Sequence, residues 1–187
     1  MIKLKTPLKE EDVRKLKIGD KVELNGTIFT ARDMAHKYFI ENPSEFKEKL
    51  KNSVIYHCGP IAKKKKEWKI IAAGPTTSIR EEPYEAYIIK NYRIKAVIGK
   101  GGMGKKTLGA LKKYGCVYLS VVGGAAALLA NSIKKVKNVY KLEFGVPEAI
   151  WELEVKNFPA IVTMDAKGNS LHKNILELSE KRYNKLK

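Results

Sequence analysis

The chain has 187 residues, 44% of them hydrophobic, so it is long enough to bury a core and too apolar for a disordered segment. With two cysteines, it lacks the composition of a small secreted domain held by disulfides. The formal net charge of +17 indicates an anionic partner, either nucleic acid or a small anionic substrate together with an acidic protein.

Further features of the composition bear on where the protein works. No stretch reaches the roughly 18 apolar residues that a membrane-spanning helix needs, and charged residues close to Met1 interrupt any signal peptide. We therefore expect a single domain over residues 1–187, located in the cytoplasm and not attached to a membrane. Glutamine is absent while lysine, glutamate and isoleucine are frequent, which is a thermophile-like bias.

The positive charge is concentrated in the second half of the chain. Residues 86–142 contain no aspartate or glutamate. The same stretch holds twelve basic residues, namely Lys90, Arg93, Lys95, Lys100, Lys105, Lys106, Lys112, Lys113, Lys134, Lys135, Lys137 and Lys141. This distribution predicts a face or cleft with a strongly positive potential.

The first predicted elements are a hairpin and a helix. Apolar residues alternate on both sides of Asn25-Gly26, which predicts a β-hairpin over residues 20–30. Thr30 or a near neighbour can then cap a helix that continues to Phe39. A solvated basic turn is expected at residues 63–66.

The rest of the chain alternates between short apolar runs and segments with helical spacing. Strands are expected at residues 54–57, 68–73, 94–98, 117–122, 136–144, 150–155 and 160–164. Helices are expected at residues 79–91, 105–114 and 123–130, and a polar C-terminal helix at about 171–187. Strand–helix alternation in the middle of the chain is typical of a parallel sheet with crossovers. The pattern predicts an α/β fold with a mixed sheet flanked by helices.

A glycine cluster between a predicted strand and helix is the first candidate binding site. Gly99, Gly101 and Gly104 match the G-x-G-x-x-G pattern of a dinucleotide-binding turn. The acidic residue expected about 20 positions later is absent, and Lys106 stands where a phosphate-binding P-loop has Ser or Thr. Backbone amides at the helix start, with Lys100 beside them, could still bind an anion such as a carboxylate. The alternative is a tight turn with a solvated lysine.

A second candidate anion site follows a Gly-Pro break. Thr76, Thr77 and Ser78 come directly before a predicted helix, with Arg80 two residues further on. Arginine binds a carboxylate through two parallel hydrogen bonds, so these groups could converge on one anion. The alternative is that one hydroxyl only caps the helix.

Arg32 is a third candidate, because an arginine at a helix start opposes the helix dipole and suggests a functional reason. The alternative is a surface ion pair with Asp33 or a glutamate. The three histidines, His36, His57 and His172, have no metal-ligand spacing and are expected as packed or surface residues.

Six segments, in this order and spacing, carry a resemblance to a known family. They are Thr-Ala-Arg-Asp-Met-Ala-His (30–36), Tyr-His-Cys-Gly-Pro (56–60), Ala-Gly-Pro-Thr-Thr-Ser-Ile-Arg (73–80), Gly-Lys-Gly-Gly-Met (99–103), Pro-Glu-Ala-Ile-Trp (147–151) and Met-Asp-Ala-Lys-Gly-Asn-Ser-Leu (164–171). Together they resemble the beta subunit of class I fumarase and L(+)-tartrate dehydratase, which also forms the C-terminal part of single-chain class I fumarases. The resemblance runs from about Thr6 to about Leu176.

The resemblance implies a swivelling β/β/α domain that works with a cluster-bearing alpha subunit, as an α2β2 heterotetramer. That subunit would hold a 4Fe-4S cluster on three cysteines, and the active site would lie at the interface between the subunits. The two cysteines of this chain agree with such a division, because a four-iron cluster takes three or four thiolates. No metal ligand is expected on this chain, which alone should be inactive or nearly so.

The implied activity is a hydro-lyase reaction, the reversible hydration of fumarate to L-malate in the tricarboxylic acid cycle. The alternative is dehydration of L(+)-tartrate to oxaloacetate. By resemblance, Arg32 binds a substrate carboxylate, Thr76 acts in proton abstraction, and Thr77, Arg80 and Lys100 complete the substrate site. Two arginines and a lysine suit the developing dianionic charge. Threonine is a poor base when free, so Thr76 could instead only orient the substrate.

Other classes of function compete with this interpretation. A basic nucleic-acid-binding module would explain the charge of +17, but the cations are not interleaved with an aromatic stacking motif, so nucleic acid is not the favoured partner. A nucleotide-binding enzyme built on Gly99–Gly104 lacks the acid and hydroxyl residues described above. A non-catalytic regulatory subunit would not need all of the candidate site residues.

Overall fold

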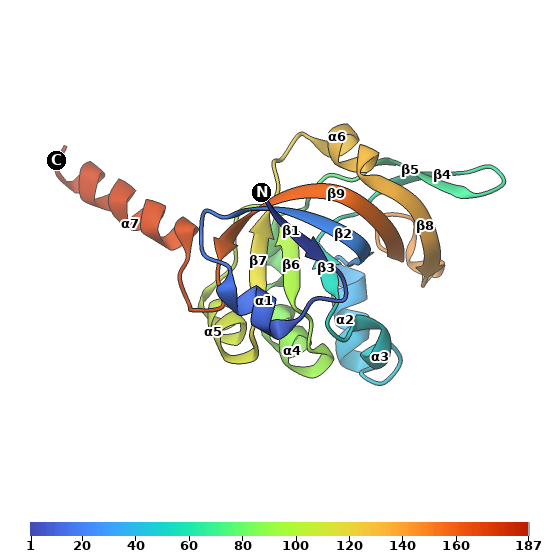
Figure 1. Ribbon diagram of the computed structural model, residues 1–187, viewed down its shortest axis with the longest axis horizontal. Coiled ribbons are helices and arrows are strands. Elements are labelled where there is room, and N and C mark those ends of the chain that lie inside the picture. The colour runs from blue at the N-terminus through green and yellow to red at the C-terminus, as the bar shows by residue number, and fades with distance from the viewer. Residues whose placement is uncertain (187) are drawn as a thin grey trace.

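The chain folds into a partly closed mixed sheet flanked by helices, and the computed structural model describes residues 1–186 (Figure 1). The strands are β1 (Ile2–Lys5), β2 (Lys21–Thr30), β3 (Val54–Tyr56), β4 (Ile61–Lys64), β5 (Trp68–Ala72), β6 (Ala96–Gly99), β7 (Val117–Ser120), β8 (Ile133–Tyr140) and β9 (Ile150–Met164). The helices are α1 (Glu10–Lys15), α2 (Asp33–Glu41), α3 (Lys47–Leu50), α4 (Glu82–Tyr92), α5 (Lys105–Tyr114), α6 (Ala126–Asn131) and α7 (Leu171–Asn184). Two short 3-10 helices, η1 and η2, cover Ser78–Glu81 and Leu142–Phe144.

Pairing of β2 with β9 closes the middle of the sheet into a ring. The order of the seven-stranded sheet is β1-β2-β3-β6-β7-β9-β8, and the additional pairing of β2 with β9 joins five of these strands in a circle. Strands β2, β3, β6 and β7 run parallel, whereas β9 is antiparallel to both β2 and β7. The predicted α/β class, with a mixed sheet flanked by helices, is confirmed.

Alternate residues of the ring strands divide between two apolar cores, because successive side chains of a strand point to opposite faces. Tyr56, Ile98 and Leu119 belong to the core inside the ring. Ile55 and Val97 belong to a second core, which also contains buried residues of helices α2, α4 and α5. The helices therefore cover the outside of the parallel strands.

The predicted hairpin over residues 20–30 is wrong. Strand β2 continues through Asn25-Gly26, and a register shift between Leu24 and Gly26 marks a bulge in its pairing with β9. Gly26 has a φ of +104°. The Asn25 side chain accepts a hydrogen bond from the Asn157 backbone amide, at 2.9 Å. Long pairing with β9 overrides the local turn preference, so the glycine absorbs a bulge instead of reversing the chain.

The strands predicted at residues 150–155 and 160–164 are one continuous strand, β9. It pairs with β8 along its first part and with β7 along its last part, and pairing with β2 carries it across Asn157 and Pro159. The strand predicted at 136–144 is β8, which ends at Tyr140 and is followed by η2.

Most predicted helices form, with shifted boundaries. Helix α5 has the predicted bounds, and the helix expected at residues 79–91 is built from η1 and α4. The small-residue helix starts later than expected, at Ala126. Strand β1 and helix α1 had no sequence-based prediction. The predicted basic turn at residues 63–66 lies at the exposed tip of the β4–β5 hairpin.

Helix α7 extends away from the sheet (Figure 1). Its N-cap, Ser170, accepts a hydrogen bond from the Lys173 backbone amide at 3.3 Å. Ile175, Leu176 and Leu178 are exposed, and none of the helix residues is buried. The prediction of this helix included residue 187, which lies outside the described residues. Within residues 1–186, the helices are all too short or too polar to cross a membrane.

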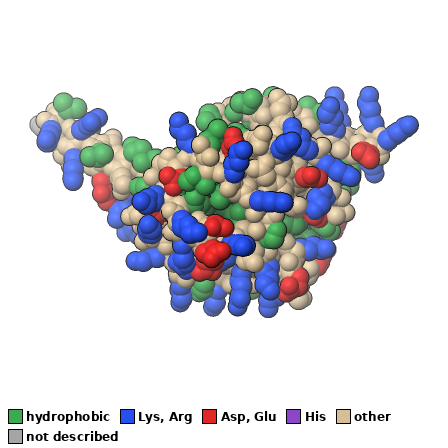
Figure 2. Space-filling model, viewed as in Figure 1, with side chains coloured by type: hydrophobic (Ala, Val, Ile, Leu, Met, Phe, Trp, Pro, Cys, Tyr) green, Lys and Arg blue, Asp and Glu red, His purple; other side chains and the backbone are tan. Residues whose placement is uncertain are grey.

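The acid-free stretch does not form one uninterrupted basic face. Lys95 is buried and pairs with Glu10, at 2.7 Å between Nζ and Oε2. Acids from distant segments also pair with Lys137 and Lys141. Figure 2 shows Lys and Arg side chains scattered over the viewed face, and α5 and β8 lie at different ends of the molecule (Figure 1). This dispersal removes the main argument for a nucleic-acid-binding groove.

We predict that Gly26→Ala destabilises the fold by about 3 kcal/mol, because it combines a positive φ with a steric collision. A Cβ at Gly26 would collide with Thr6 Oγ1 and would lie 3.2 Å from the Thr6 carbonyl oxygen. Gly19→Ala is the matched control, because Gly19 also has a positive φ, of +93°, but open space around it. That control should cost only about 1 kcal/mol in urea denaturation. Equal losses in the two variants would contradict the collision with Thr6.

Candidate active site

The candidate residues gather at one edge of the ring, where the parallel strands end. Ala31 and His57 continue the ladder beyond β2 and β3, through Ala31 N to Tyr56 O at 3.0 Å and His57 N to Ile98 O at 2.8 Å. Arg32 and Lys100 are therefore the residues next to this extended edge. Ligands of open parallel sheets bind outside the carboxyl ends of the strands, and this ring presents the same kind of edge.

The threonine segment is joined to the turn that carries Lys100. The Thr76 backbone amide donates to His57 O at 2.8 Å, and the Ser78 amide donates to Lys100 O at 3.0 Å. Thr77 and Lys100 form an isolated parallel bridge. The structure thus brings together Thr76, Thr77 and Lys100.

The Thr76 hydroxyl is buried, and no residue within 1–186 gives it a hydrogen bond. Buried polar atoms are rarely left without a partner in folded proteins, so this atom needs an explanation. Thr77, by contrast, is exposed beside it.

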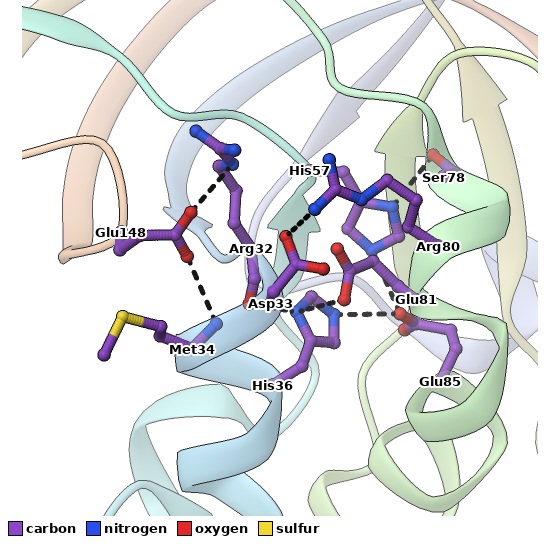
Figure 3. A network of polar contacts seen from close by, with 10 residues as sticks. All are labelled: Arg32, Asp33, Met34, His36, His57, Ser78, Arg80, Glu81, Glu85 and Glu148. Carbon is purple, nitrogen blue, oxygen red and sulfur yellow. Dashed lines mark hydrogen bonds and ion pairs between the residues drawn. The ribbon is translucent and has the colours of Figure 1, made fainter. Parts of the chain in front are cut away.

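Glu148 holds Arg32 at the start of α2 (Figure 3). Its two carboxylate oxygens lie 3.2 Å from Arg32 Nε and 3.1 Å from the Met34 amide, which donates to it. Gly59 leaves room for the guanidinium, because a Cβ there would lie 2.5 Å from Arg32 Nη1. Arg32 therefore forms the ion pair with a glutamate that the alternative interpretation expected. The pair is not on the open surface, because only 23% of the arginine side chain is exposed.

The prediction that Thr30 or a near neighbour caps α2 is only half right. Arg32 occupies the N-cap position, but its side chain makes no capping hydrogen bond. Thr30 Oγ1 instead accepts from the Trp151 amide at 3.1 Å and donates to Ala149 O at 3.3 Å. A carboxylate from a distant segment, Glu148, satisfies the helix start, and sequence spacing gives no signal for such a partner.

Arg80 faces the same edge from η1. Its Nη2 donates to Asp33 Oδ2 at 2.8 Å, and 56% of its side chain is exposed (Figure 3). Exposed pairs of this kind contribute little to stability. The guanidinium therefore remains accessible to an incoming anion, while Asp33 keeps it near the start of α2.

Beneath this edge lies a fully buried polar network that the sequence analysis missed. His36 Nε2 and His57 Nε2 lie 3.1 Å and 3.0 Å from the same oxygen, Glu85 Oε2 (Figure 3). Burial alone would raise the pKa of Glu85, but hydrogen bonds from the two histidines outweigh it and lower the pKa to about 2. His36 and His57 lie 49 and 28 positions before Glu85 in the sequence, so no spacing rule could have found the three residues.

The two histidines respond differently to this environment. Burial lowers the pKa of His36, but the hydrogen bond and charge of Glu85 reverse the effect and leave the pKa raised. For His57, burial dominates and the pKa is lowered. His172 lies apart from them, 3.0 Å from Thr163 Oγ1. The expectation of packed histidines therefore holds for His36 and His57, although both join an ionic cluster.

The two cysteine thiols are buried and protonated. Cys58 and Cys116 are buried free thiols, and burial raises the pKa of Cys58 to about 12 and also raises that of Cys116. Iron–sulfur clusters are held by thiolates, so protonated buried thiols do not suit them. His36, His57 and Glu85 do offer ligand atoms within 4.8 Å of one another, but these atoms already stand at hydrogen-bond distances.

The N-terminus of α5, the helix after the glycine cluster, is occupied by the carboxylate of Glu82. Glu82 accepts hydrogen bonds from the amides of Gly104, Lys106 and Thr107, at 2.7, 3.1 and 3.2 Å. It also accepts from the Thr107 hydroxyl at 2.6 Å. An internal carboxylate thus occupies the helix N-terminus that the dinucleotide and P-loop interpretations require. Those interpretations are wrong, and only Lys100 of this motif remains a candidate.

The fold and the site define a class: an α/β protein with a closed mixed ring that carries, at the ends of its parallel strands, two arginines, a lysine and a hydroxyl without a hydrogen-bond partner among residues 1–186. Comparison with known proteins identifies the family. Residues 1–175 match the family model of the fumarase C-terminus. The chain belongs to this family.

Individual relatives carry two different names. A candidate class I fumarate hydratase of Geobacillus stearothermophilus is 51% identical over 100% of this chain, but the chain spans only 36% of that protein. A candidate L(+)-tartrate dehydratase subunit beta of Methanocaldococcus jannaschii is 51% identical over 96% of this chain and 93% of its own length. The L(+)-tartrate dehydratase subunit beta of Escherichia coli is 38% identical over 90% of this chain and 85% of its own length.

We predict that Glu82→Gln destabilises the protein by about 1 to 2 kcal/mol, because the charged acceptor at the start of α5 is lost. Glu11→Gln is the matched control, since Glu11 is exposed and lies 3.9 Å from Lys9. The control should change the free energy of unfolding by less than about 0.5 kcal/mol. Urea denaturation compares the two, and an equally small loss in Glu82→Gln would argue against the capping role.

We also predict that Glu81→Gln stabilises the protein only at high pH. Glu81 is buried, and its burial raises the pKa of the carboxyl from 4.5 to about 7. The stability that the protonated carboxyl contributes is present below pH 4.5 and is lost as the pH rises through about 7. The variant should therefore match the wild type near pH 4.5 and exceed it by up to about 3 kcal/mol near pH 8. A pH-independent difference in denaturant unfolding would disprove this assignment.

Proposed function

We propose that the chain is the beta subunit of an iron–sulfur-dependent hydro-lyase that hydrates fumarate reversibly to L-malate. The observation that carries the proposal is the gathering at one edge of Arg32, Arg80, Lys100 and the Thr76 hydroxyl, which has no hydrogen-bond partner among residues 1–186. Family membership and the names of the relatives support the same reaction class.

The proposal divides the active site between two proteins. A cluster-bearing alpha subunit, in an α2β2 heterotetramer, would hold the 4Fe-4S cluster on its own cysteines. The buried, protonated state of Cys58 and Cys116 supports this division. When bound, the cluster supplies a Lewis acid for the hydroxyl that enters or leaves. The name "subunit beta" of two relatives is consistent with an alpha partner.

Substrate binding falls to the cations of this chain. A four-carbon dicarboxylate carries two charges, and the planar guanidinium groups of Arg32 and Arg80 match carboxylates in a bidentate geometry. Each arginine already faces one carboxylate, Glu148 or Asp33, which keeps its head group near the edge before substrate arrives. Lys100 adds a point charge from the turn after β6, and Thr77 a hydroxyl beside it.

Thr76 is the group assigned to proton transfer. Hydration adds a hydroxyl to one alkene carbon and a proton to the other, and dehydration removes that proton from the carbon beside a carboxylate. The charge then develops on this carboxylate, where Arg32, Arg80 and Lys100 stabilise it. An alkoxide is costly in water, so a buried Thr76 hydroxyl would need these cations to act as a base. If it does not, it orients the substrate through the same hydrogen bond.

L(+)-tartrate dehydration to oxaloacetate is the second candidate. The observation that favours it is the chain-length match to two beta subunits that carry the tartrate dehydratase name. Tartrate and fumarate are both four-carbon dicarboxylates and would use the same cations. The test below therefore includes both substrates.

We predict that Arg80→Ala and Lys100→Ala each lower kcat/KM by about 100-fold or more in the reconstituted complex, because each removes a charge that the transition state uses. Lys113→Ala is the control, since Lys113 is an exposed cation in the last turn of α5. The chain is co-expressed with a candidate alpha subunit without oxygen, and loss of fumarate or tartrate is followed by absorbance and product analysis.

Gel filtration should show intact assembly for all variants. Near-normal turnover in Arg80→Ala and Lys100→Ala would overturn the site assignment. A wild-type complex with an intact cluster but no turnover of either substrate would overturn the proposed function. The faster substrate decides between the two activities.

A further inference from the structure

One buried network touches each segment that carries a proposed site residue. His36 Nδ1 lies 2.8 Å from the carbonyl oxygen of Arg32. His57 accepts the Thr76 amide through its backbone oxygen, and its Nδ1 lies 2.9 Å from Ser78 Oγ. Because the Ser78 amide donates to Lys100 O, the turn after β6 is connected as well. These segments come from separate parts of the chain, and the network adds buried side-chain contacts to the backbone hydrogen bonds and the Arg80–Asp33 pair that also join them.

The hydrogen atoms of this network can be assigned from the chemistry of its partners. The Arg32 carbonyl can only accept, so His36 Nδ1 must carry a proton. Glu85 Oε2 faces a ring nitrogen of each histidine, at 3.1 and 3.0 Å. Imidazole is more basic than a carboxylate, so the shared protons reside on the nitrogens. His36 is then protonated on both nitrogens, as an imidazolium.

His57 can remain neutral in the same arrangement. Its Nε2–H donates to Glu85, and its Nδ1 accepts from the Ser78 hydroxyl. The Tyr118 hydroxyl donates to Ser78 Oγ at 2.8 Å, which orients the serine proton toward His57. Hydrogen bonds therefore form a continuous chain from Tyr118 through Ser78 and His57 to the Glu85 carboxylate, and each group in it donates to the next.

We propose that His36, Glu85 and His57 are positioning residues of the active site: a buried imidazolium–carboxylate pair and a neutral histidine that fix the spacing between Arg32 and the Thr76–Arg80 segment. This inference rests on the proposed function for its catalytic consequence, but the protonation pattern stands without it. The pair is neutral overall, so its role is geometric and not a supply of positive charge. A buried pair of this kind is better suited to specifying geometry than to adding stability.

The charges around His36 agree with this assignment. Glu85 faces it from α4, and Glu81 from η1 with Oε2 at 3.4 Å from Nδ1. Asp33 lies in the first turn of the same helix, and the Tyr84 ring lies 6.3 Å from the imidazole. The ionised Glu85 favours the charged ring over the neutral one, and the raised pKa of His36 has the same direction.

The first test needs no activity. Nitrogen-15 NMR of the full chain should show His36 with protons on both ring nitrogens, and His57 with a proton on Nε2 alone, between about pH 6 and 8. The chain has three histidines, so a His172→Gln variant removes the third and completes the assignment. A neutral His36 would overturn the proposal. One equivalent of a transition metal, detected by mass spectrometry and lost in His36→Gln, would overturn it as well.

The second test uses the reconstituted complex. Glu85→Gln removes the carboxylate but keeps its shape, and it should leave His36 neutral and lower kcat by about 10- to 100-fold. Glu85→Asp retains the charge and should recover part of the loss. Glu81→Gln is the matched control, because Glu81 is a buried acid beside the same imidazole but connects no site segment. The control should keep near-normal turnover.

If Glu85→Gln does not fold, Ser78→Ala takes its place, because it removes the hydroxyl that contacts His57 and Tyr118 and leaves His36 and Glu85 unchanged. It should lower kcat by about 10-fold and change the His57 ring resonances. Unchanged turnover in a folded Glu85→Gln or Ser78→Ala complex would overturn the positioning role. A wild-type complex without turnover would count against the proposed function alone, since the NMR result remains valid.

Discussion

The antiparallel pairing of β2 with β9 is the contact on which the rest of the structure depends. It extends from Lys21 opposite Ile161 to Phe29 opposite Glu152, and it turns an open sheet into a ring. Closure gives β2 and β9 partners on both sides, while β1 and β8 remain the edge strands of the sheet. Within this ring, the parallel pairing of β2 with β3 and of β3 with β6 brings their carboxyl ends to one edge, so that Arg32, His57 and Lys100 meet although they are far apart in the chain.

Carboxylates hold several of the groups around this edge in place, although the chain carries a net charge of +17. Glu148 holds Arg32, Asp33 holds Arg80, and Glu82 satisfies the start of α5. Glu85 joins the two histidines underneath. Each of these carboxylates meets a cation or backbone amides, so the acids fix the positions of the groups around the site.

The comparisons place the same unit in two contexts. The chain covers 93% of the Methanocaldococcus relative but 36% of the Geobacillus relative, so the unit occurs both nearly alone and as part of a longer protein. Such a unit can serve in either arrangement if its binding edge faces the neighbouring protein. The two names of these relatives concern substrates of the same length and charge, and cationic clamps recognise those common features rather than the groups that differ.

The sequence by itself determined the α/β class, the position of α5 and the segments that hold the candidate residues, because apolar period, glycine and proline act locally. Only the tertiary structure decided that Asn25-Gly26 is a bulge and that residues 150–164 are one strand, since pairing with distant partners overrides local turn preference. It alone also revealed Glu82 at the helix start and the His36–Glu85–His57 network. These contacts join residues tens of positions apart, and a short-range pattern carries no information about them.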